Sequence, residues 1–146
     1  MNTRAERGTE RVGSGKHVLV VWNEEGFRLV LTEHLKEAGF EVTAVDSGRG
    51  GLDAAGMQRF DLVVLDFGLG RGETAEGYIT GFREASSGTP IVVMTNRLPE
   101  DLERDCADLQ RLKQRVAGLV YVQPDRTWWA ELPGRLQGYI KCEHGC

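Results

Sequence analysis

The stretch Phe60–Gly72, FDLVVLDFGLGRG, decides the fold predicted for this chain. Its centre, Leu62–Leu65, is an unbroken apolar run without polar alternation. Such a run indicates a strand that is covered on both faces, as the central strands of parallel sheets are. The strand ends in a carboxylate, Asp66, and a glycine-rich loop follows it. Because the chemistry of open α/β sheets lies beyond the carboxyl ends of the strands, Asp66 is the first candidate for a functional site.

Four further segments have the character of short strands, and they lie on both sides of this one. Three are almost wholly apolar, which indicates burial on both faces, and the other alternates polar and apolar residues, which places it near an edge of the sheet. In chain order they are His17–Val21 (HVLVV), Glu41–Val45 (EVTAV, the alternating one), Ile91–Met94 (IVVM) and Leu119–Val122 (LVYV).

Apolar residues at spacings of three and four predict a helix after each strand. The predicted helices cover residues 27–38, 52–60, 78–82, 98–116 and 128–140. Asn23 is the expected N-cap of the first helix, and the second follows a turn at residues 46–51. The fourth is expected to be one continuous amphipathic helix, which Gly118 closes. Pro133 is expected to kink the last helix or to delay its start.

Five strands that alternate with helices imply βαβ units, a parallel sheet and right-handed crossovers, so the predicted fold class is α/β. No internal repeat or proline-rich linker divides the chain, and we expect one domain over residues 16–141. Residues 1–15 mix charged and small residues without a period and are expected to form a mobile leader. Residues 142–146 are expected to form a short tail.

Composition excludes several classes of protein. The chain has 146 residues, of which 40% are hydrophobic and 27% charged, the balance of a soluble globular domain. No apolar run approaches the ~20 residues of a membrane span, and the N-terminus lacks the apolar segment of a secretory signal. The net charge of −4 provides no general attraction to nucleic acid. We therefore expect a cytoplasmic protein with no membrane or nucleic-acid partner.

The three cysteines also favour the cytoplasm, because an odd number without an export signal indicates reduced thiols. Cys106 lies in an apolar helical register and is expected to be a small buried hydrophobe. The tail carries Cys142, His144 and Cys146, which are three potential soft ligands. A structural zinc site normally needs four, so a frayed end is the favoured interpretation of the tail.

A fivefold βα chain with an aspartate at the end of its third strand resembles the receiver domain of bacterial response regulators. The resemblance covers nearly the whole chain after the leader and rests on the ordered set HVLVV, LVVLD, PIVVMT and YVQP. It implies a three-layer, doubly wound, flavodoxin-like sheet with strand order 2-1-3-4-5. It also implies a signalling module of a two-component phosphorelay, not an enzyme, whose partner is a histidine kinase or another signalling protein.

The resemblance implies roles for particular residues. In that family the aspartate at the end of the third strand accepts a phosphoryl group from a histidine kinase, and Asp66 matches it. Thr95, at the end of the fourth strand, matches the hydroxyl residue that bonds the phosphoryl oxygen. Mg²⁺ is normally held with the help of two acidic residues at the end of the first strand. The corresponding metal site here comprises Asn23, Asp66 and Gly68.

Several positions depart from the family pattern. Trp22 and Asn23 replace the acidic pair, and Gln123 stands where a lysine normally pairs with the phosphoryl group. Asn23 offers a carbonyl oxygen without charge, Trp22 is bulky enough to fill part of the pocket, and Gln123 offers a neutral donor. Glu24 is a candidate for a compensating acid, although its more ordinary role is to favour the positive end of the helix dipole. Gly70 stands where the family usually has proline, so a loose, flexible loop is expected there.

These departures affect the groups that phosphoryl transfer requires. Transfer to a carboxylate brings two anions together, and a divalent metal and a cation usually neutralise the transferring oxygens. Mg²⁺ prefers hard carboxylate oxygens. Both the acidic pair that helps to hold Mg²⁺ and the lysine that pairs with the phosphoryl group are replaced here. The sequence therefore predicts a degenerate receiver that binds Mg²⁺ weakly or not at all. Such a protein would signal through protein–protein contacts, with weak or no phosphorylation at Asp66.

Three aromatic residues are candidates for an interface. Trp128 and Trp129 are adjacent and point to different sides of the last helix, so one is expected in the core and the other at an exposed interface. Tyr121 stands beside the position of the family's switch aromatic. In receivers, the face formed by the fourth helix, fifth strand and fifth helix is a common dimer and partner surface. The resemblance therefore implies a partner or homodimer contact at this face.

Two alternatives stay open at this point. In the first, the chain is a phosphorylatable single-domain receiver that accepts phosphate from a histidine kinase at Asp66. In the second, it is a flavodoxin-like protein that binds a nucleotide or flavin. Reaction with acetyl phosphate and Mg²⁺ tests the first, and the absorption spectrum of the purified protein with a nucleotide-binding screen tests the second.

Overall fold

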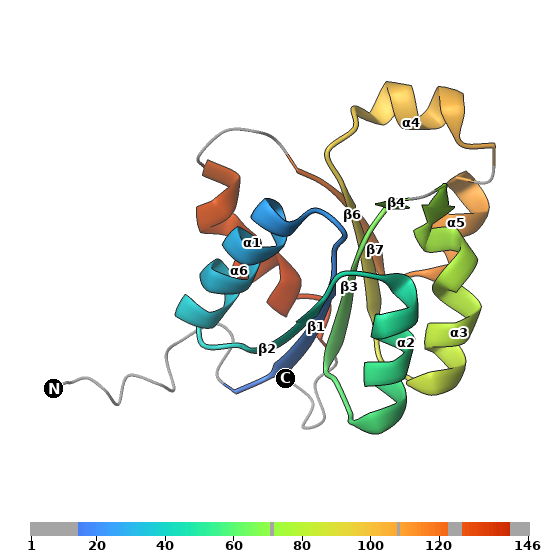
Figure 1. The fold of residues 1–146 in the computed structure, drawn as a ribbon. Helices are drawn as coiled ribbons and strands as arrows, with labels where there is room; N and C mark the ends of the chain where they lie inside the picture. Colours follow the sequence, from blue (N-terminus) through green and yellow to red (C-terminus); the bar gives the residue numbers. More distant parts are fainter. Residues whose placement is uncertain (1–14, 71, 108, 123–126, 141–146) are drawn as a thin grey trace, which may run out of the picture.

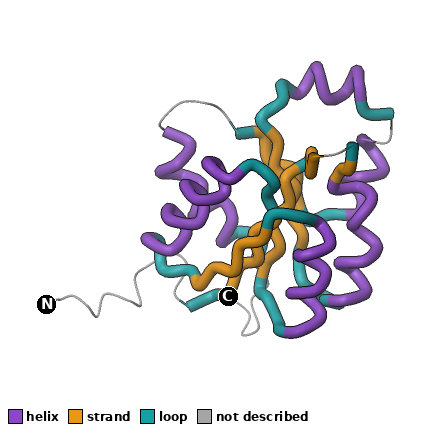
Figure 2. Tube along the Cα trace, viewed as in Figure 1, coloured by secondary structure: helices purple, strands orange, loops and turns teal. Residues whose placement is uncertain are grey.

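The computed structural model describes residues 15–70, 72–107, 109–122 and 127–140, apart from the side chains of residues 127 and 128. Within this part of the chain, a five-stranded parallel sheet has the order β2-β1-β3-β6-β7. Helices cover both of its faces and give the molecule three layers (Figures 1 and 2). These are the five expected strands in the order 2-1-3-4-5, so the predicted fold class and topology are confirmed.

Strands and helices alternate along the chain, except that α4 and α5 follow each other, and a small antiparallel hairpin (β4–β5) follows β3. The bounds are β1 His17–Val21, α1 Glu25–Glu37, β2 Glu41–Val45, α2 Gly48–Met57, β3 Leu62–Asp66, β4 Gly68–Gly70, β5 Glu73–Thr74, the 3₁₀ turn η2 Ala75–Tyr78, α3 Ile79–Ala85, β6 Ile91–Thr95, α4 Pro99–Asp105, α5 Leu109–Arg115, β7 Gly118–Tyr121 and α6 Thr127–Gln137.

The sheet divides the core into two clusters, because successive residues of a strand point to opposite faces. In β1, Leu19 and Val21 pack beneath α2, α3 and α5, whereas Val18 and Val20 pack beneath α1 and α6. All residues of β6 are buried. Burial on both faces is what the unbroken apolar runs require, and the alternating segment forms the edge strand β2, as predicted.

The second helix begins and ends earlier than predicted. It starts at Gly48, inside the segment expected to be a turn, because Ser47 Oγ accepts a hydrogen bond of 2.9 Å from the backbone N–H of Gly50 and caps the helix. At the other end, Phe60 lies beyond α2 and is only 4% exposed. It lies between α2 and β3 and packs into the core.

The predicted single helix over residues 98–116 is wrong, because α4 and α5 are separate. The backbone is extended at Cys106, with φ −111° and ψ 101°. Asp105 is the last residue of α4, where a negative charge interacts unfavourably with the helix dipole. Its carboxylate forms ion pairs with Arg97 and Arg104. These contacts tie the end of α4 to the loop after β6. Figure 1 shows α4 above the carboxyl edge of the sheet, apart from α5.

Two expectations for the C-terminal part are also wrong. α6 runs through Pro133, so its start is not delayed to that residue, while the alternative, a kink there, stays a prediction. Leu132 and Leu136 on this helix are 1% and 0% exposed, and their packing offsets the hydrogen bond that proline removes. Gly118 opens β7 and does not close the preceding helix. A Cβ atom at Gly118 would lie 2.5 Å from ring atoms of Tyr139, so glycine lets this ring approach the strand.

Two glycines of α2 should respond in opposite ways to the same substitution. A Cβ atom at Gly51 would lie 2.8 Å from both Phe82 Cζ and Val21 Cγ2, whereas one at Gly56 would meet nothing within 4 Å. We expect Gly51→Ala to destabilise the protein by about 1–2 kcal/mol through overpacking. Gly56→Ala should stabilise it by about 0.5–1 kcal/mol through helix propensity. Urea unfolding of both variants measures this, and equal signs would contradict the packing of α2 described here.

Candidate functional site

Asp66 is the last residue of β3 and lies half-buried at the carboxyl edge of the sheet. Its Oδ1 accepts a hydrogen bond of 3.3 Å from the backbone N–H of Gly68. Burial raises the pKa of Asp66 from 3.8 to about 7, and the bond from Gly68 offsets only part of this rise. No cationic side chain of the described residues contributes to the pKa shift. The carboxyl group is therefore partly protonated at neutral pH.

Thr95 lies at the end of the neighbouring strand, on the same edge of the sheet. β3 and β6 pair in parallel with Asp66 beside Met94, so Thr95 follows directly. Thr95 is 2% exposed, and its Oγ1 accepts a hydrogen bond of 3.1 Å from the backbone N–H of Arg97. It pairs in register with Tyr121 of β7. The structure thus places Asp66 and Thr95 at neighbouring strand ends, as expected from the sequence.

Trp22 follows β1 and belongs to the core. It is 5% exposed, and its ring stacks on Phe27 with centroids 4.4 Å apart, in the cluster beneath α1 and α6. That this ring also fills part of the pocket beside Asp66 stays a prediction, since β1 and β3 pair in parallel with Val21 beside Leu65, the residues just before Trp22 and Asp66. Arg28, which the sequence analysis missed, donates from Nη1 to the backbone oxygens of Trp22 (2.9 Å) and Asn23 (3.2 Å). A bond from a helix side chain back to the preceding loop leaves no sequence signal.

Asn23 is exposed and lies against the hairpin that follows Asp66. Its Nδ2 donates to the backbone oxygen of Asp46 at 3.4 Å. A Cβ atom at Gly70 would lie 2.9 Å from Asn23 Oδ1, and Gly70 has a φ of +83°. A proline requires a φ near −65°, so it could not adopt this backbone. Two departures from the family pattern therefore contact each other, and the segment expected to be a flexible loop forms the β4–β5 hairpin.

Glu24 caps α1, in place of the expected Asn23. Its Oε1 accepts from the backbone N–H of Phe27 at 2.7 Å and its Oε2 from that of Gly26 at 3.0 Å. Both oxygens of this carboxylate are thus bonded within the first turn, which favours the ordinary capping role over that of a compensating acid.

The residues at this edge do not fit a magnesium site well. Neither Trp22 nor Asn23 carries a carboxylate, and Glu24 is bonded to the helix. Among the residues that the structure describes, no group of three or more His, Cys, Asp or Glu side chains is placed to hold a metal ion. Mg²⁺ prefers charged oxygen ligands in an octahedral shell, and Asp66 supplies a carboxyl group that is partly protonated at neutral pH.

Trp129 lies where α6 meets α1. It is half-buried, and its ring stacks on His34 of α1 with centroids 4.4 Å apart and lies 5.4 Å from the Phe27 ring. It therefore packs α6 against α1, which fits the expectation that one of the two tryptophans belongs to the core, and the interface role stays a prediction. Tyr121 is half-buried on the opposite face of the sheet, where burial and, to a smaller extent, Glu103 raise the pKa of its hydroxyl group.

Several predictions fall outside the described part of the chain. They concern the leader before residue 15, Gln123, the side chain of Trp128, and the tail with Cys142, His144 and Cys146. These residues keep the roles that the sequence predicts, as predictions. Cys106, which was expected to be buried, is a free cysteine of intermediate exposure.

Comparison with known proteins gives this geometry its context. The family model described as "Response regulator receiver domain" matches residues 18–111. Two-component response regulator ORR5 of Oryza sativa is 31% identical over 99 residues, which cover 66% of this chain and 72% of that protein. The uncharacterized transcriptional regulatory protein YkoG of Bacillus subtilis is 36% identical over 81 residues, 56% of this chain but 35% of YkoG. The chain thus matches about a third of YkoG's length.

Solved structures agree on the fold. The chemotaxis response regulator CheY4 of Vibrio cholerae has a TM-score of 0.71 and 24% identity, over 86% of this chain and 99% of that one. A receiver domain described as CheY-like, from Methylobacillus flagellatus, has a TM-score of 0.69 and 18% identity, over 86% of this chain and 98% of that one.

Proposed function

The chain belongs to the family of response regulator receiver domains, and from this membership we propose that it is a degenerate receiver. In this proposal it signals through contacts with protein partners, with weak or no Mg²⁺-dependent phosphorylation at Asp66. Receiver domains are signalling modules of two-component systems. Membership in this family favours this interpretation over a flavodoxin-like protein that binds a nucleotide or flavin.

The proposal rests on the lack, among the described residues, of the charged groups that phosphoryl transfer to Asp66 needs. A phosphoacceptor must be ionised to attack, yet burial raises the pKa of Asp66 to about 7, and no cationic side chain among the described residues lowers it. The family's acidic pair is replaced by a core tryptophan and by Asn23, whose amide is neutral. Phosphoryl transfer between anions depends on cations that neutralise the transferring oxygens. Each of these features slows the reaction at Asp66.

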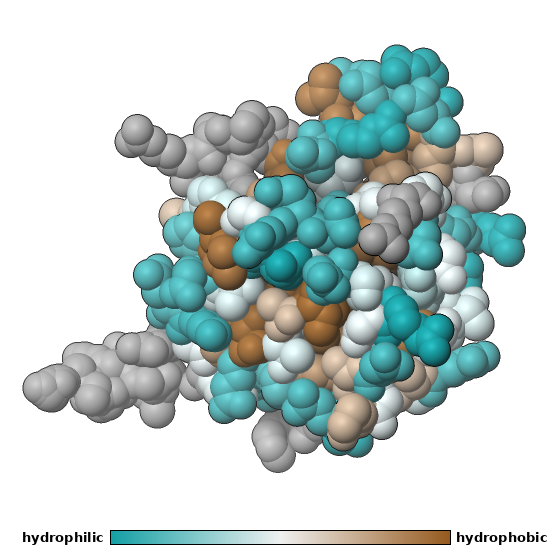
Figure 3. All heavy atoms as spheres, in the orientation of Figure 1, coloured by the Kyte–Doolittle hydropathy of each residue, from teal (hydrophilic) through white to brown (hydrophobic). Residues whose placement is uncertain are grey.

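The proposed partner is a histidine kinase or another signalling protein, or a second copy of the chain. The candidate surface is the face that contains α4, α5, β7 and α6. Leu98, just before α4, is 50% exposed, while the surface where α4 lies is mostly hydrophilic (Figure 3). The cytoplasm is the proposed location. No helix in the described residues has the length and apolarity to cross a membrane.

Reaction with a small phosphodonor tests the proposal directly. We expect incubation with acetyl phosphate and Mg²⁺ at pH 7 to leave the intact mass of the protein unchanged, or to phosphorylate only a minor fraction. The physical reason is that the carboxyl group is partly protonated and that no described side chain supplies a neutralising cation. Intact-protein mass spectrometry measures the phosphoryl adduct.

An Asp66→Asn variant serves as the control for this experiment. A stoichiometric adduct on the unaltered protein that disappears in the variant would establish the alternative, a phosphorylatable receiver. An adduct of equal size in both proteins would lie elsewhere on the chain and would leave Asp66 unmodified, as proposed.

A further inference from the structure

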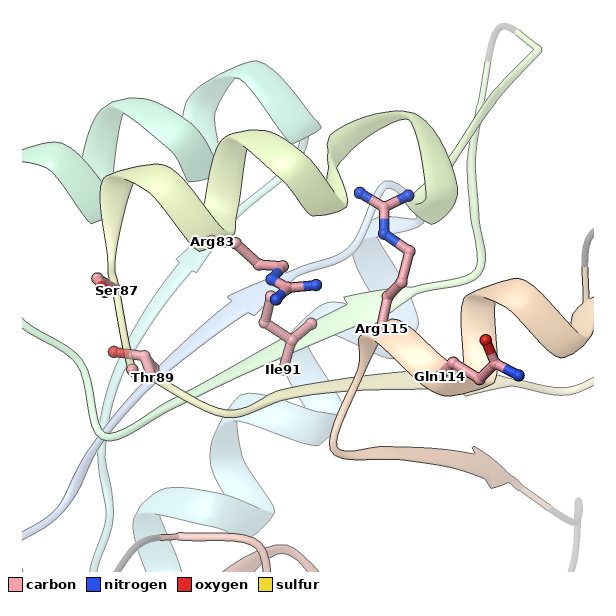
Figure 4. Close-up of a pocket in the computed structure, with 7 residues that line it drawn as sticks. Arg83, Ser87, Thr89, Ile91, Gln114 and Arg115 are labelled. Carbon is pink, nitrogen blue, oxygen red and sulfur yellow. The ribbon is translucent and has the colours of Figure 1, made fainter.

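A polar cavity opens between α3 and α5, at the start of β6 and so at the end of the sheet opposite Asp66. It has a volume of about 300 Å³. Its lining includes two arginines and no acidic residue, although the chain as a whole has a net charge of −4. The polar lining residues are Arg83, Ser87, Gly88, Thr89, Gln114 and Arg115. Figure 4 shows Arg83 reaching in from α3 and Arg115 from the end of α5, beside Ile91.

Arg115 is held in place by its own contacts. Its Nη1 lies 3.3 Å from Glu76 Oε2, and its Nη2 donates to Thr80 Oγ1. Both partners belong to the η2–α3 segment, so Arg115 joins α5 to that segment. A guanidinium has five N–H donors, and these two bonds leave three of them for a ligand. Fixing the side chain before binding lowers the entropy cost of that binding.

Arg83 supplies the unbalanced charge. It is exposed and has no ion pair or side-chain hydrogen bond with any described residue. The turn beside it contains Gly88, with a φ of +85°, and the hydroxyl groups of Ser87 and Thr89. Guanidinium groups bind oxyanions through paired, charge-assisted hydrogen bonds. Within the described part of the chain, the cavity therefore combines the ion-paired guanidinium of Arg115, the unpaired guanidinium of Arg83 and small polar groups.

We propose that this cavity binds the phosphate group of a small phosphomonoester or inorganic phosphate. Arg115 is balanced by Glu76, so Arg83 supplies the net charge, while the donors of both guanidinium groups suit the several oxygens of a phosphate better than the two of a carboxylate. The lining contains no aromatic side chain on which a base could stack, which disfavours a nucleotide. The site is independent of Asp66, because it lies at the opposite end of the strands.

Titration of the full chain with inorganic phosphate, followed by ¹H–¹⁵N NMR at constant ionic strength and without Mg²⁺, tests this site. The Asp66→Asn variant is used so that the acceptor edge cannot react. We expect the amide signals of Ser87 and Gly88 to shift with a dissociation constant in the low-millimolar range or tighter. Arg83→Gln should weaken binding by about tenfold, because it removes one charge-assisted contact.

Arg49→Gln is the matched control, since Arg49 is an exposed helical arginine whose side chain is 84% accessible and lies 3.8 Å from Asp53. It should leave phosphate binding unchanged. Glycerol phosphate should shift the same signals as inorganic phosphate, and acetate should shift them at least tenfold more weakly. Equal weakening by both arginine substitutions, equal binding of acetate, or the absence of any shift at Ser87 and Gly88 would overturn the proposal.

Discussion

Replacing Asp66 by asparagine is expected to stabilise the folded protein by about 2 kcal/mol at pH 8 and to change its stability little near pH 4. The effect follows from burial, which raises the pKa of this carboxyl group from 3.8 to about 7. Full conversion of that shift gives about 4 kcal/mol, and we halve it because the side chain is partly exposed to solvent.

The sign follows from proton binding. Between pH 3.8 and about pH 7 the folded state holds a proton on Asp66 that the unfolded state has released. The contribution of the neutral carboxyl group to stability is thus complete below the unfolded pKa and is lost as the pH rises through the folded one. Asparagine is neutral at every pH, so the advantage of the variant should grow between pH 4 and pH 7 and level off above.

Urea unfolding at pH 4, 6 and 8, followed by tryptophan fluorescence, measures this dependence. Asp53→Asn provides the control, because the Asp53 side chain is 71% exposed on α2. Its effect on stability should be small at all three pH values. A destabilised Asp66→Asn variant at pH 8 would contradict the argument and would show that the ionised carboxylate has a stabilising partner in the folded protein.

The sheet could be predicted from the sequence more fully than the helices. The apolar run Val18–Val21 locates β1, because a strand that is buried on both faces is apolar at nearly every position. Helix ends depend on side-chain caps and on tertiary contacts. Ser47 begins α2 early, and the extended backbone at Cys106 separates α4 from α5 although no glycine or proline marks the break.

At the candidate site, too, some features could be predicted from the sequence and others depend on tertiary contacts. The positions of Asp66 and Thr95 follow from strand ends alone, since parallel strands meet at one edge. The burial of Trp22 under α1 and the contact between Asn23 and Gly70 join segments far apart in the chain. The raised pKa of Asp66 likewise depends on the surrounding structure. Periodicity and local spacing carry no information on such contacts.

Asn23→Asp is expected to raise the affinity of the protein for Mg²⁺ by about ten- to a hundredfold. Asn23 is exposed at the end of β1 and lies against Gly70 of the hairpin whose first residue, Gly68, donates to Asp66. A carboxylate at position 23 would add a charged oxygen beside this edge. The bound cation would in turn favour the ionised form of Asp66 and lower its pKa, because an opposite charge stabilises the carboxylate.

Isothermal titration calorimetry with MgCl₂ at constant ionic strength measures the change in Mg²⁺ affinity. The Glu24→Gln variant tests whether Glu24 binds the metal. Because both oxygens of Glu24 cap α1, the Glu24→Gln variant should bind Mg²⁺ as the unaltered protein does. Weaker binding in that variant would make Glu24 the compensating acid.

Unchanged affinity in Asn23→Asp would mean that position 23 does not contact the metal, so the missing charge there could not explain a weak site. A gain in affinity together with a new phosphoryl adduct at Asp66 would show that the neutral side chain at this position limits the chemistry of the acceptor.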